Sequence, residues 1–211
     1  MKVAIERRHL RDHLGEAIRD RIVRQRLPAN QSIREHALAS ELGVSRTPVR
    51  ETLLGLERDG FVKAVPGRGF VVQPLSAEEA CQLYPIVWSL ERLALSEVTE
   101  VDPELIGQLR LINQSLISAA TQEERIRRDA DWHRCLVSVS GNPRLMAVLE
   151  GVKASIARYE HAYLDACGLG GQSVEEHEHI AKMLEEDPAR AAEAIEAHWR
   201  RGLEVILTSI G

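Results

Sequence analysis

The chain has 211 residues, of which 44% are hydrophobic and 28% are charged, and its formal net charge is −5 at pH 7. This length accommodates one or two globular domains, and the apolar runs are too short and too often interrupted by charge to cross a membrane. The first ten residues lack the apolar segment of a secretory signal, and the three cysteines form no C-x-x-C pair, so we expect a cytoplasmic protein with reduced thiols.

Residues 33–56 have the pattern of a helix, a tight turn and a second helix. Gly43 stands where the first helix must end, and Ser45 is expected to cap the second helix. Arg46, Thr47 and Arg50 would then lie near a helix N-terminus, which suits contact with the major groove of DNA. A helix pair can also be purely structural. Apolar residues at helical spacing would pack the pair on a third helix: Leu38, Leu42, Val44, Val49, Leu53 and Leu56.

The residues after this pair predict a wing. Residues 61–64 (FVKA) and 70–73 (FVVQ) favour two strands, and residues 66–69 (PGRG) favour the turn between them. Arg68 and Gly69 at the tip would allow close approach of a phosphate or minor groove. The charge is also uneven, since residues 1–75 hold 14 Lys and Arg against 9 Asp and Glu, whereas the remaining residues hold 13 against 23. The basic portion is therefore the one expected to bind DNA.

The second portion predicts helices with almost no strand-like alternation. Helix starts recur as capping boxes or as a capping residue before proline, and CGLGG at 167–171 predicts a break. The fold class is therefore mainly α, with a winged helix-turn-helix domain and small β-hairpin at residues 1–74 and an antiparallel bundle of about six helices at residues 75–211. The expected start positions are Ser76, Asp102, Thr121, Asn142, Ser173 and Asp187.

Three histidines and one aspartate fall on the inward stripes of three predicted bundle helices. Asp129 and His133 are spaced i and i+4, whereas His177 and His198 come from the two later helices. An isolated buried carboxylate is costly, so convergence on a divalent metal would offset that cost. Carboxylate oxygen with three imidazoles suits zinc first, and nickel, iron or manganese as alternatives. An ion pair or a satisfied core histidine is the structural alternative.

The first domain resembles the winged-helix domain of GntR-type bacterial transcription regulators over roughly residues 10–73. The resemblance lies in LPANQSIREHALASELGVSRTPVRETLLGLERDGFVKAVPGRGFVV. His36 departs from the arginine that some relatives carry, so solvated surface is its alternative role. The resemblance implies that the matching positions contact double-stranded DNA: Arg34, His36, Ser45, Arg46, Thr47, Arg50 and Gly69.

The bundle resembles the helical ligand-binding FCD domain of the FadR branch of these regulators, and six helices place it closer to the VanR-like subgroup. In many members the positions matching Asp129, His133, His177 and His198 bind a metal that helps to hold a small organic acid. The resemblance therefore implies a metal cofactor and a small-molecule effector. It lies in DADWHRCLVSVSGNP (129–143), EEHEHIAKMLEEDPARA (175–191) and AHW (197–199).

One position departs from the resemblance. Relatives commonly carry an arginine, implicated in holding effector carboxylates, at the position aligned with Val87. Core packing explains a valine there equally well. We expect Arg134 or Arg158 to reach the effector pocket in its place.

The sequence thus predicts a homodimeric repressor that binds an inverted-repeat operator and responds to an organic acid held in a metal-containing helical domain. One alternative is a regulator that senses the metal ion itself. Another is a metal-dependent enzyme fused to a DNA-binding domain, although no general base is evident beside the four ligands. We expect no enzymatic activity.

Overall fold

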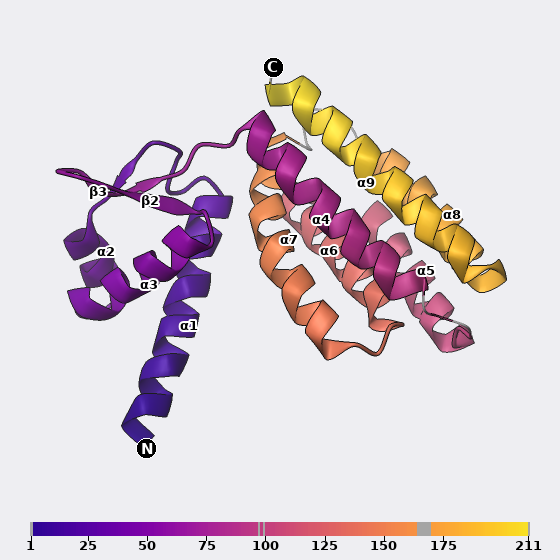
Figure 1. Ribbon diagram of the computed structural model, residues 1–211, viewed down its shortest axis with the longest axis horizontal. Helices are drawn as coiled ribbons and strands as arrows, with labels where there is room; N and C mark the ends of the chain where they lie inside the picture. The colour runs from indigo at the N-terminus through magenta and orange to yellow at the C-terminus, as the bar shows by residue number, and fades with distance from the viewer. Residues whose placement is uncertain (1, 97, 99, 164–169, 211) are drawn as a thin grey trace. The chain divides into compact units, whose positions relative to one another are not determined.

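The computed structural model describes residues 2–96, 98, 100–163 and 170–210, and the chain divides into two compact units, Met1–Leu75 and Ser76–Gly211. Helices dominate both units, and among the described residues strands occur only in the first (Figure 1). No helix in the described part of the chain is both long enough and apolar enough to cross a membrane.

Three helices form the body of the first unit: α1 (Lys2–Val23), α2 (Glu35–Glu41) and α3 (Arg46–Arg58). Leu14 and Ile18 of α1 are buried with Val49 and Leu53 of α3, and these two helices pack together. Gly43 follows α2 with a φ of +67°, the left-handed conformation that glycine adopts without strain. The predicted helix-turn-helix is therefore confirmed, with the turn at the expected glycine.

The expectation that Ser45 caps the second helix is confirmed for its position and wrong for its hydroxyl. Ser45 occupies the N-cap position of α3 with extended backbone angles, but its side chain accepts no capping hydrogen bond. The side chain is exposed, so water can satisfy the free N–H groups of the first turn in its place.

The predicted hairpin is confirmed. Its first strand begins and ends one residue later than predicted, and its second strand begins and ends one residue earlier. Strands β2 (Val62–Val65) and β3 (Gly69–Val72) pair antiparallel, with Val62 opposite Val72 and Val65 opposite Gly69. A third strand that the sequence did not predict, β1 (Ser32–Ile33), pairs with the other side of β3, so the strand order is β1-β3-β2. Two residues are too few to show an alternating pattern.

The second unit contains six described helices, the number that the sequence predicted. Helix α4 packs along α9 and α7, and α5 packs against α6 and α8; α4 and α9 run in opposite directions (Figure 1). The helices are α4 (Ala77–Ser96), α5 (Pro103–Ile117), α6 (Gln122–Ser138), α7 (Pro143–Tyr163), α8 (Gly170–Glu186) and α9 (Pro188–Ile210).

Most predicted helix starts carry the expected cap. The side chains of Asp102, Thr121, Asn142 and Asp187 each accept a backbone N–H from the first turn of the helix that follows. Ser173 is the exception, because α8 already begins at Gly170 and encloses it. Part of the predicted CGLGG break, Cys167 to Leu169, lies outside the described residues.

A buried carboxylate joins four helices of the bundle. Glu91 of α4 is fully buried, and its Oε2 accepts hydrogen bonds from His133 Nδ1 of α6 at 2.8 Å and from Trp199 Nε1 of α9 at 2.7 Å. Its Oε1 lies 2.5 Å from Lys153 Nζ of α7. Burial alone would raise the pKa of Glu91, but the nearby His133 and Lys153 lower it to about 2. The group is therefore an ionised acceptor at neutral pH.

We predict that Glu91→Gln lowers the free energy of unfolding by about 3 kcal/mol at pH 7 in the presence of EDTA, because a pKa lowered from 4.5 to about 2 stabilises the fold by roughly that amount. A lowered carboxyl pKa contributes stability above pH 4.5, and that contribution disappears as the pH falls from 4.5 through about 2. The difference between the two proteins should narrow over that range. Urea denaturation followed by tryptophan fluorescence measures it, since all three tryptophans belong to this unit.

Glu150→Gln is the matched control, because Glu150 is half exposed and, among the described residues, pairs only with the exposed Arg134. It should change the free energy of unfolding by less than about 1 kcal/mol. Equal effects of the two substitutions at pH 7 would contradict a structural role for the buried carboxylate.

Candidate DNA-binding surface and metal centre

The N-terminal end of α3 presents several of the predicted DNA contacts to solvent. Ser45, Arg46 and Thr47 are exposed at the start of this helix. Among the described residues, the Arg46 guanidinium has no hydrogen bond or ion pair, so it is available to an external acceptor. Arg50 lies one turn later, where its Nη1 is 3.1 Å from Glu35 Oε1. This ion pair holds Arg50 against α2.

The other predicted contacts lie on α2 and at the wing. Arg34 precedes α2 at its N-cap position, and both Arg34 and His36 are exposed. Arg68 at the tip of the hairpin is exposed, and its Nη2 donates to the Asn30 carbonyl at 3.3 Å. Gly69 has a φ of +72°, and a Cβ there would meet nothing within 4 Å. Glycine is therefore favoured at this position by backbone conformation rather than by lack of space.

The bundle brings together the three predicted histidine ligands. One possible ligand atom from each of His133, His177 and His198 can be chosen so that all lie within 4.8 Å of one another. His133 and His177 are buried, and the side chain of His198 is 11% exposed. Each histidine comes from a different helix, α6, α8 or α9. The three side chains meet because each lies on the inward stripe of its own helix.

The fourth predicted ligand, Asp129, lies beside two of these histidines. Its Oδ2 is 3.7 Å from His133 Nε2, and its Oδ1 is 3.6 Å from His177 Nε2. His133 Nε2 and both ring nitrogens of His177 are buried and have no hydrogen-bond partner in the described structure. Unpartnered buried nitrogens are costly, and a cation placed beside the carboxylate would satisfy one nitrogen of His133 and one of His177. The donor set therefore fits a divalent metal.

Two carboxylates orient the imidazoles of His133 and His198 through their Nδ1 atoms. Ionised Glu91 can only accept a hydrogen bond, so the proton of the neutral His133 ring lies on Nδ1, which leaves Nε2 with a free lone pair. Glu176 does the same for His198, whose Nδ1 lies 2.6 Å from Glu176 Oε2. Burial would raise the pKa of Glu176, but its hydrogen bonds from His198 and Arg201 lower it to about 2.

Burial also favours the neutral form of two of the histidines. Loss of solvent lowers the pKa of His133, although Glu91 opposes the change. The pKa of His177 is well below its usual value, first because of burial and then because of the neighbouring His133 and His198. The His177 ring also stacks on Trp132, with 3.7 Å between ring centroids and 2° between planes. Neutral, fixed imidazoles are the form that binds metal.

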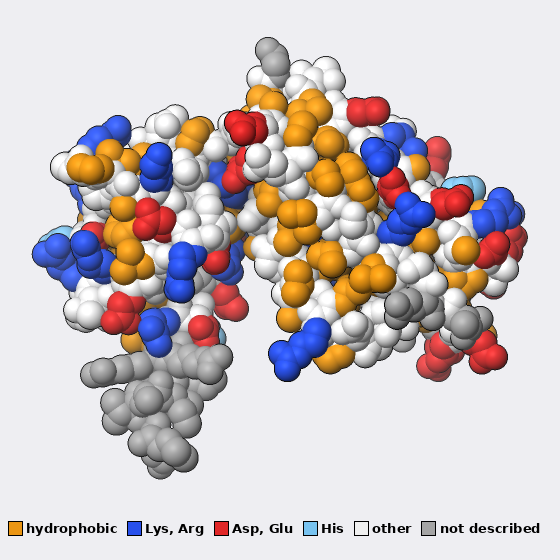
Figure 2. All heavy atoms as spheres, viewed as in Figure 1, with side chains coloured by type: hydrophobic (Ala, Val, Ile, Leu, Met, Phe, Trp, Pro, Cys, Tyr) orange, Lys and Arg blue, Asp and Glu red, His pale blue; other side chains and the backbone are white. Residues whose placement is uncertain are grey.

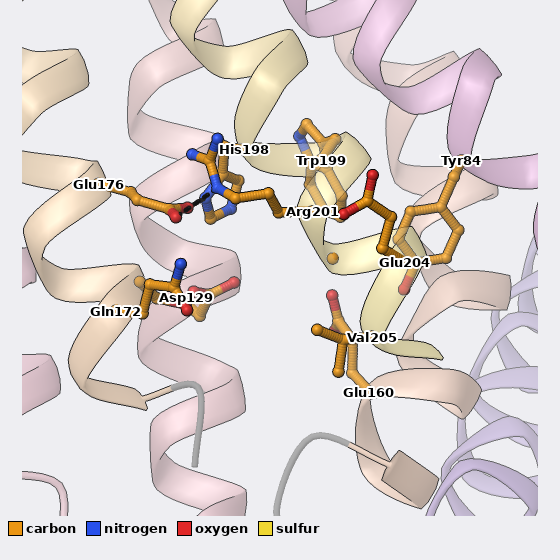
Figure 3. A pocket seen from close by; sticks show the side chains of 12 residues that line it. Tyr84, Asp129, Glu160, Gln172, Glu176, His198, Trp199, Arg201, Glu204 and Val205 are labelled. Atoms are coloured by element: carbon orange, nitrogen blue, oxygen red, sulfur yellow. Dashed lines mark hydrogen bonds and ion pairs between the residues drawn. The ribbon is translucent and has the colours of Figure 1, made fainter. Parts of the chain in front are cut away.

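A cavity of about 240 Å³ opens beside this cluster, and we call it the α8–α9 cavity. Figure 3 shows Glu176, His198, Asp129 and Gln172 on one side and Tyr84, Glu160 and Glu204 on the other. Its lining also includes Ser173, Trp199, Arg201, Gly202 and Val205. Burial and the nearby Asp129 raise the pKa of Glu160 to about 8.

The two arginines expected to reach this pocket do not line it. Arg134 is half exposed and donates to Glu150 Oε1 and Asp131 Oδ1, each at 2.8 Å. Arg158 is buried, and its Nη1 lies 3.7 Å from Glu79 Oε2. Carboxylates elsewhere on the unit thus engage both guanidinium groups. Val87 is fully buried, in agreement with core packing.

Sequence reasoning missed the residues that surround the four ligands. Glu91 and Lys153 looked like ordinary polar helix positions, and nothing in their spacing connects α4 with α7. Arg201 could have been found, because it follows His198 by three residues on the same helix face. Its Nε donates to Glu176 Oε1 at 2.6 Å.

Two family models match the chain. The model described as "Bacterial regulatory proteins, gntR family" covers residues 10–72, and the model of the FCD domain covers residues 82–201. The second match alone includes more than half of the chain. Both matches agree with the division into two units.

Individual relatives agree with this assignment. The HTH-type transcriptional regulator YdhC of Bacillus subtilis is 36% identical over 127 residues, a match that covers 58% of this chain and 57% of YdhC. The HTH-type transcriptional repressor NanR of Enterobacter sp. is 27% identical over 222 residues, covering 92% and 84%. The crystal structure of a GntR transcriptional regulator from Rhodococcus sp. RHA1 has the same fold, with a TM-score of 0.80, 19% identity and coverage of 95% and 98%.

These relatives and families are transcription regulators rather than enzymes. The chain therefore belongs to the GntR family of bacterial transcription regulators, with an FCD effector domain as its helical unit.

Proposed function

We propose that this regulator is a homodimeric repressor that binds an inverted-repeat operator and is controlled by a small organic acid bound next to a divalent metal. Two DNA-binding units related by twofold symmetry would recognise half-sites about one helical turn apart. The name of the relative NanR, a transcriptional repressor, supports repression rather than activation.

One observation carries the effector part of the proposal. Unpartnered histidine nitrogens and Asp129 converge next to a cavity whose lining includes both Asp129 and His198. A metal held by Asp129, His133, His177 and His198 would act as a Lewis acid for an oxygen of the effector. Three imidazoles and one carboxylate favour zinc, with nickel, iron and manganese as alternatives.

The cavity wall explains how a ligand could change the conformation of the unit. It draws side chains from five helices, α4, α6, α7, α8 and α9. A ligand that contacts all of them favours the arrangement in which they are closest together. Because α4 is the first helix after the DNA-binding unit, such a bias can alter operator affinity if the two arrangements bind DNA differently.

The cavity also favours control by a metabolite over control by the ion alone. A metal sensor needs the four ligands, but it needs no space beside them. Here about 240 Å³ adjoins the ligands and is lined by polar groups such as Gln172 and Arg201. This volume is suited to a small molecule.

Exposed apolar side chains support a second copy of the chain as the dimer partner. Figure 2 shows hydrophobic side chains gathered on the face formed by α4 and α7. Ile86 and Leu93 of α4 are 45% and 47% exposed, and Val148 of α7 is 56% exposed. Exposed apolar surface of this kind is typical of interaction sites, and a twofold axis across this face would bury it.

We predict that Arg46→Ala weakens binding to DNA from upstream of the regulator's own gene by about 10- to 100-fold, because one guanidinium contact to a base contributes about 1–3 kcal/mol. Electrophoretic mobility shift at fixed salt measures the effect. Arg58→Ala is the control, because Arg58 is exposed at the opposite end of the same helix. Equal affinity of the Arg46→Ala protein and the wild type would count against α3 as the recognition helix.

We predict that protein stripped with a chelator and reloaded with zinc retains about one ion per chain and that His177→Ala loses it. His179→Ala is the matched control, since His179 is exposed on the same helix two residues away. Inductively coupled plasma mass spectrometry after gel filtration gives the metal content, and circular dichroism checks the fold. Unchanged zinc in the His177→Ala protein would exclude the proposed ligand set.

We predict that Leu93→Asp shifts the protein from dimer to monomer, because a charge on the apolar α4–α7 face would be desolvated in the dimer. Light scattering coupled to gel filtration measures the mass. Leu111→Asp serves as control, since Leu111 is 68% exposed on α5. A dimer that persists after Leu93→Asp would place the interface elsewhere.

A further inference from the structure

We infer that the effector carries a cationic group, of the ammonium type, that binds at the side of the α8–α9 cavity formed by Glu160, Glu204 and Tyr84. This inference rests on the proposed function, because it defines the chemistry of the effector in that cavity. It adds a second recognition element to the oxygen that would bind at the Asp129 side.

Carboxylates outnumber cations in the cavity wall. Asp129, Glu160, Glu176 and Glu204 line it, whereas Arg201 is the only lysine or arginine among its described residues. Arg201 is already engaged, since its Nε donates to Glu176 Oε1 at 2.6 Å. A ligand that offered only carboxylates would therefore meet no free cation on the wall apart from a metal.

Glu160 and Glu204 have no side-chain partner in the part of the chain that the structure describes. Among the described residues, neither side chain makes a hydrogen bond or an ion pair. Lys153, a neighbouring cation, is already engaged by Glu91 Oε1 at 2.5 Å. Glu160 is partly buried, and Glu204 is exposed to solvent. In this partly buried position Glu160 stays mainly protonated at pH 7 unless a counter-charge is present, and a ligand cation would supply the charge that stabilises its carboxylate form.

Tyr84 is an independent sign that a polar ligand group binds here. Its side chain belongs to a residue only 2% exposed, yet its hydroxyl has no hydrogen-bond partner in the described part of the chain. Figure 3 shows the ring directed into the cavity, toward Glu160. The ring packs edge-on against Trp199, with 5.8 Å between centroids. The hydroxyl oxygen itself is accessible from the cavity, so a polar group of a ligand there is in position to hydrogen-bond to it.

The two sides of the cavity together define a ligand class. A small amino acid, with its two charges separated by a short aliphatic chain, satisfies both sides. A simple monocarboxylate or dicarboxylate satisfies only one.

Three probes of matched length test this inference: 4-aminobutyrate, butyrate and butylammonium, each titrated by calorimetry into the zinc-loaded full-length protein at pH 7. We expect 4-aminobutyrate to bind at least about tenfold more tightly than butyrate, as one charge-assisted interaction provides. Butylammonium should also bind, and it should still do so after the zinc is removed.

Glu160→Gln and Glu204→Gln should each reduce the preference for 4-aminobutyrate over butyrate, and the double variant should abolish it. Butyrate affinity and zinc content should remain unchanged. Glu193→Gln is the matched control, since Glu193 is exposed on α9 and does not line the cavity. Circular dichroism verifies that each variant folds.

The outcomes separate this inference from the proposed function. Binding of butyrate with equal or better affinity than 4-aminobutyrate, absence of binding by both amines at millimolar concentration, or an unchanged preference in the double variant would each overturn the inference. If amine binding depends on Glu160 and Glu204 but leaves operator affinity unaltered, the inference is supported and control of DNA binding by this ligand is contradicted.

Discussion

The interaction on which the helical unit depends is the buried carboxylate of Glu91. It accepts from His133 and Trp199 and pairs with Lys153, so one side chain of α4 contacts α6, α7 and α9. Such a charge is unfavourable in an apolar core unless every partner is present. The network therefore requires one specific packing of the four helices, and any rearrangement of α4 must either preserve these contacts or leave a buried charge unpaired.

The same network prepares the candidate metal centre. Because ionised Glu91 accepts a hydrogen bond from the protonated Nδ1 of His133, the opposite nitrogen, Nε2, faces Asp129 with a free lone pair. Glu176 orients His198 in the same way and also engages Arg201, a cation of the cavity wall. Structural stability and ligand chemistry thus share residues: the carboxylates behind the histidines hold the helices together, and the carboxylates at Glu160 and Glu204 remain for a ligand.

The elements that sequence predicted best are those with local signals. Gly43, the hairpin and the i, i+4 spacing of Asp129 and His133 each reflect the geometry of one element, and the structure places them accordingly. Strand β1 was missed because two residues are too few to show the alternation of apolar and polar side chains that indicates a strand. Arg134 was assigned to the pocket, but it pairs with Asp131 three residues earlier on α6 and with Glu150 of α7, and the second partner depends on helix packing that local spacing does not encode. The Glu91 network joins residues over 100 positions apart, which no local pattern encodes.

The tautomer of His133 is the most direct test of this account, since the orientation of the metal donor depends on it. Long-range proton–nitrogen correlation spectra of the EDTA-treated protein at pH 7 report which ring nitrogen carries the proton. The account predicts a neutral His133 ring with the proton on Nδ1, and a change in the Nε2 resonance when zinc is added. A proton on Nε2 in the metal-free protein would contradict the role given to Glu91.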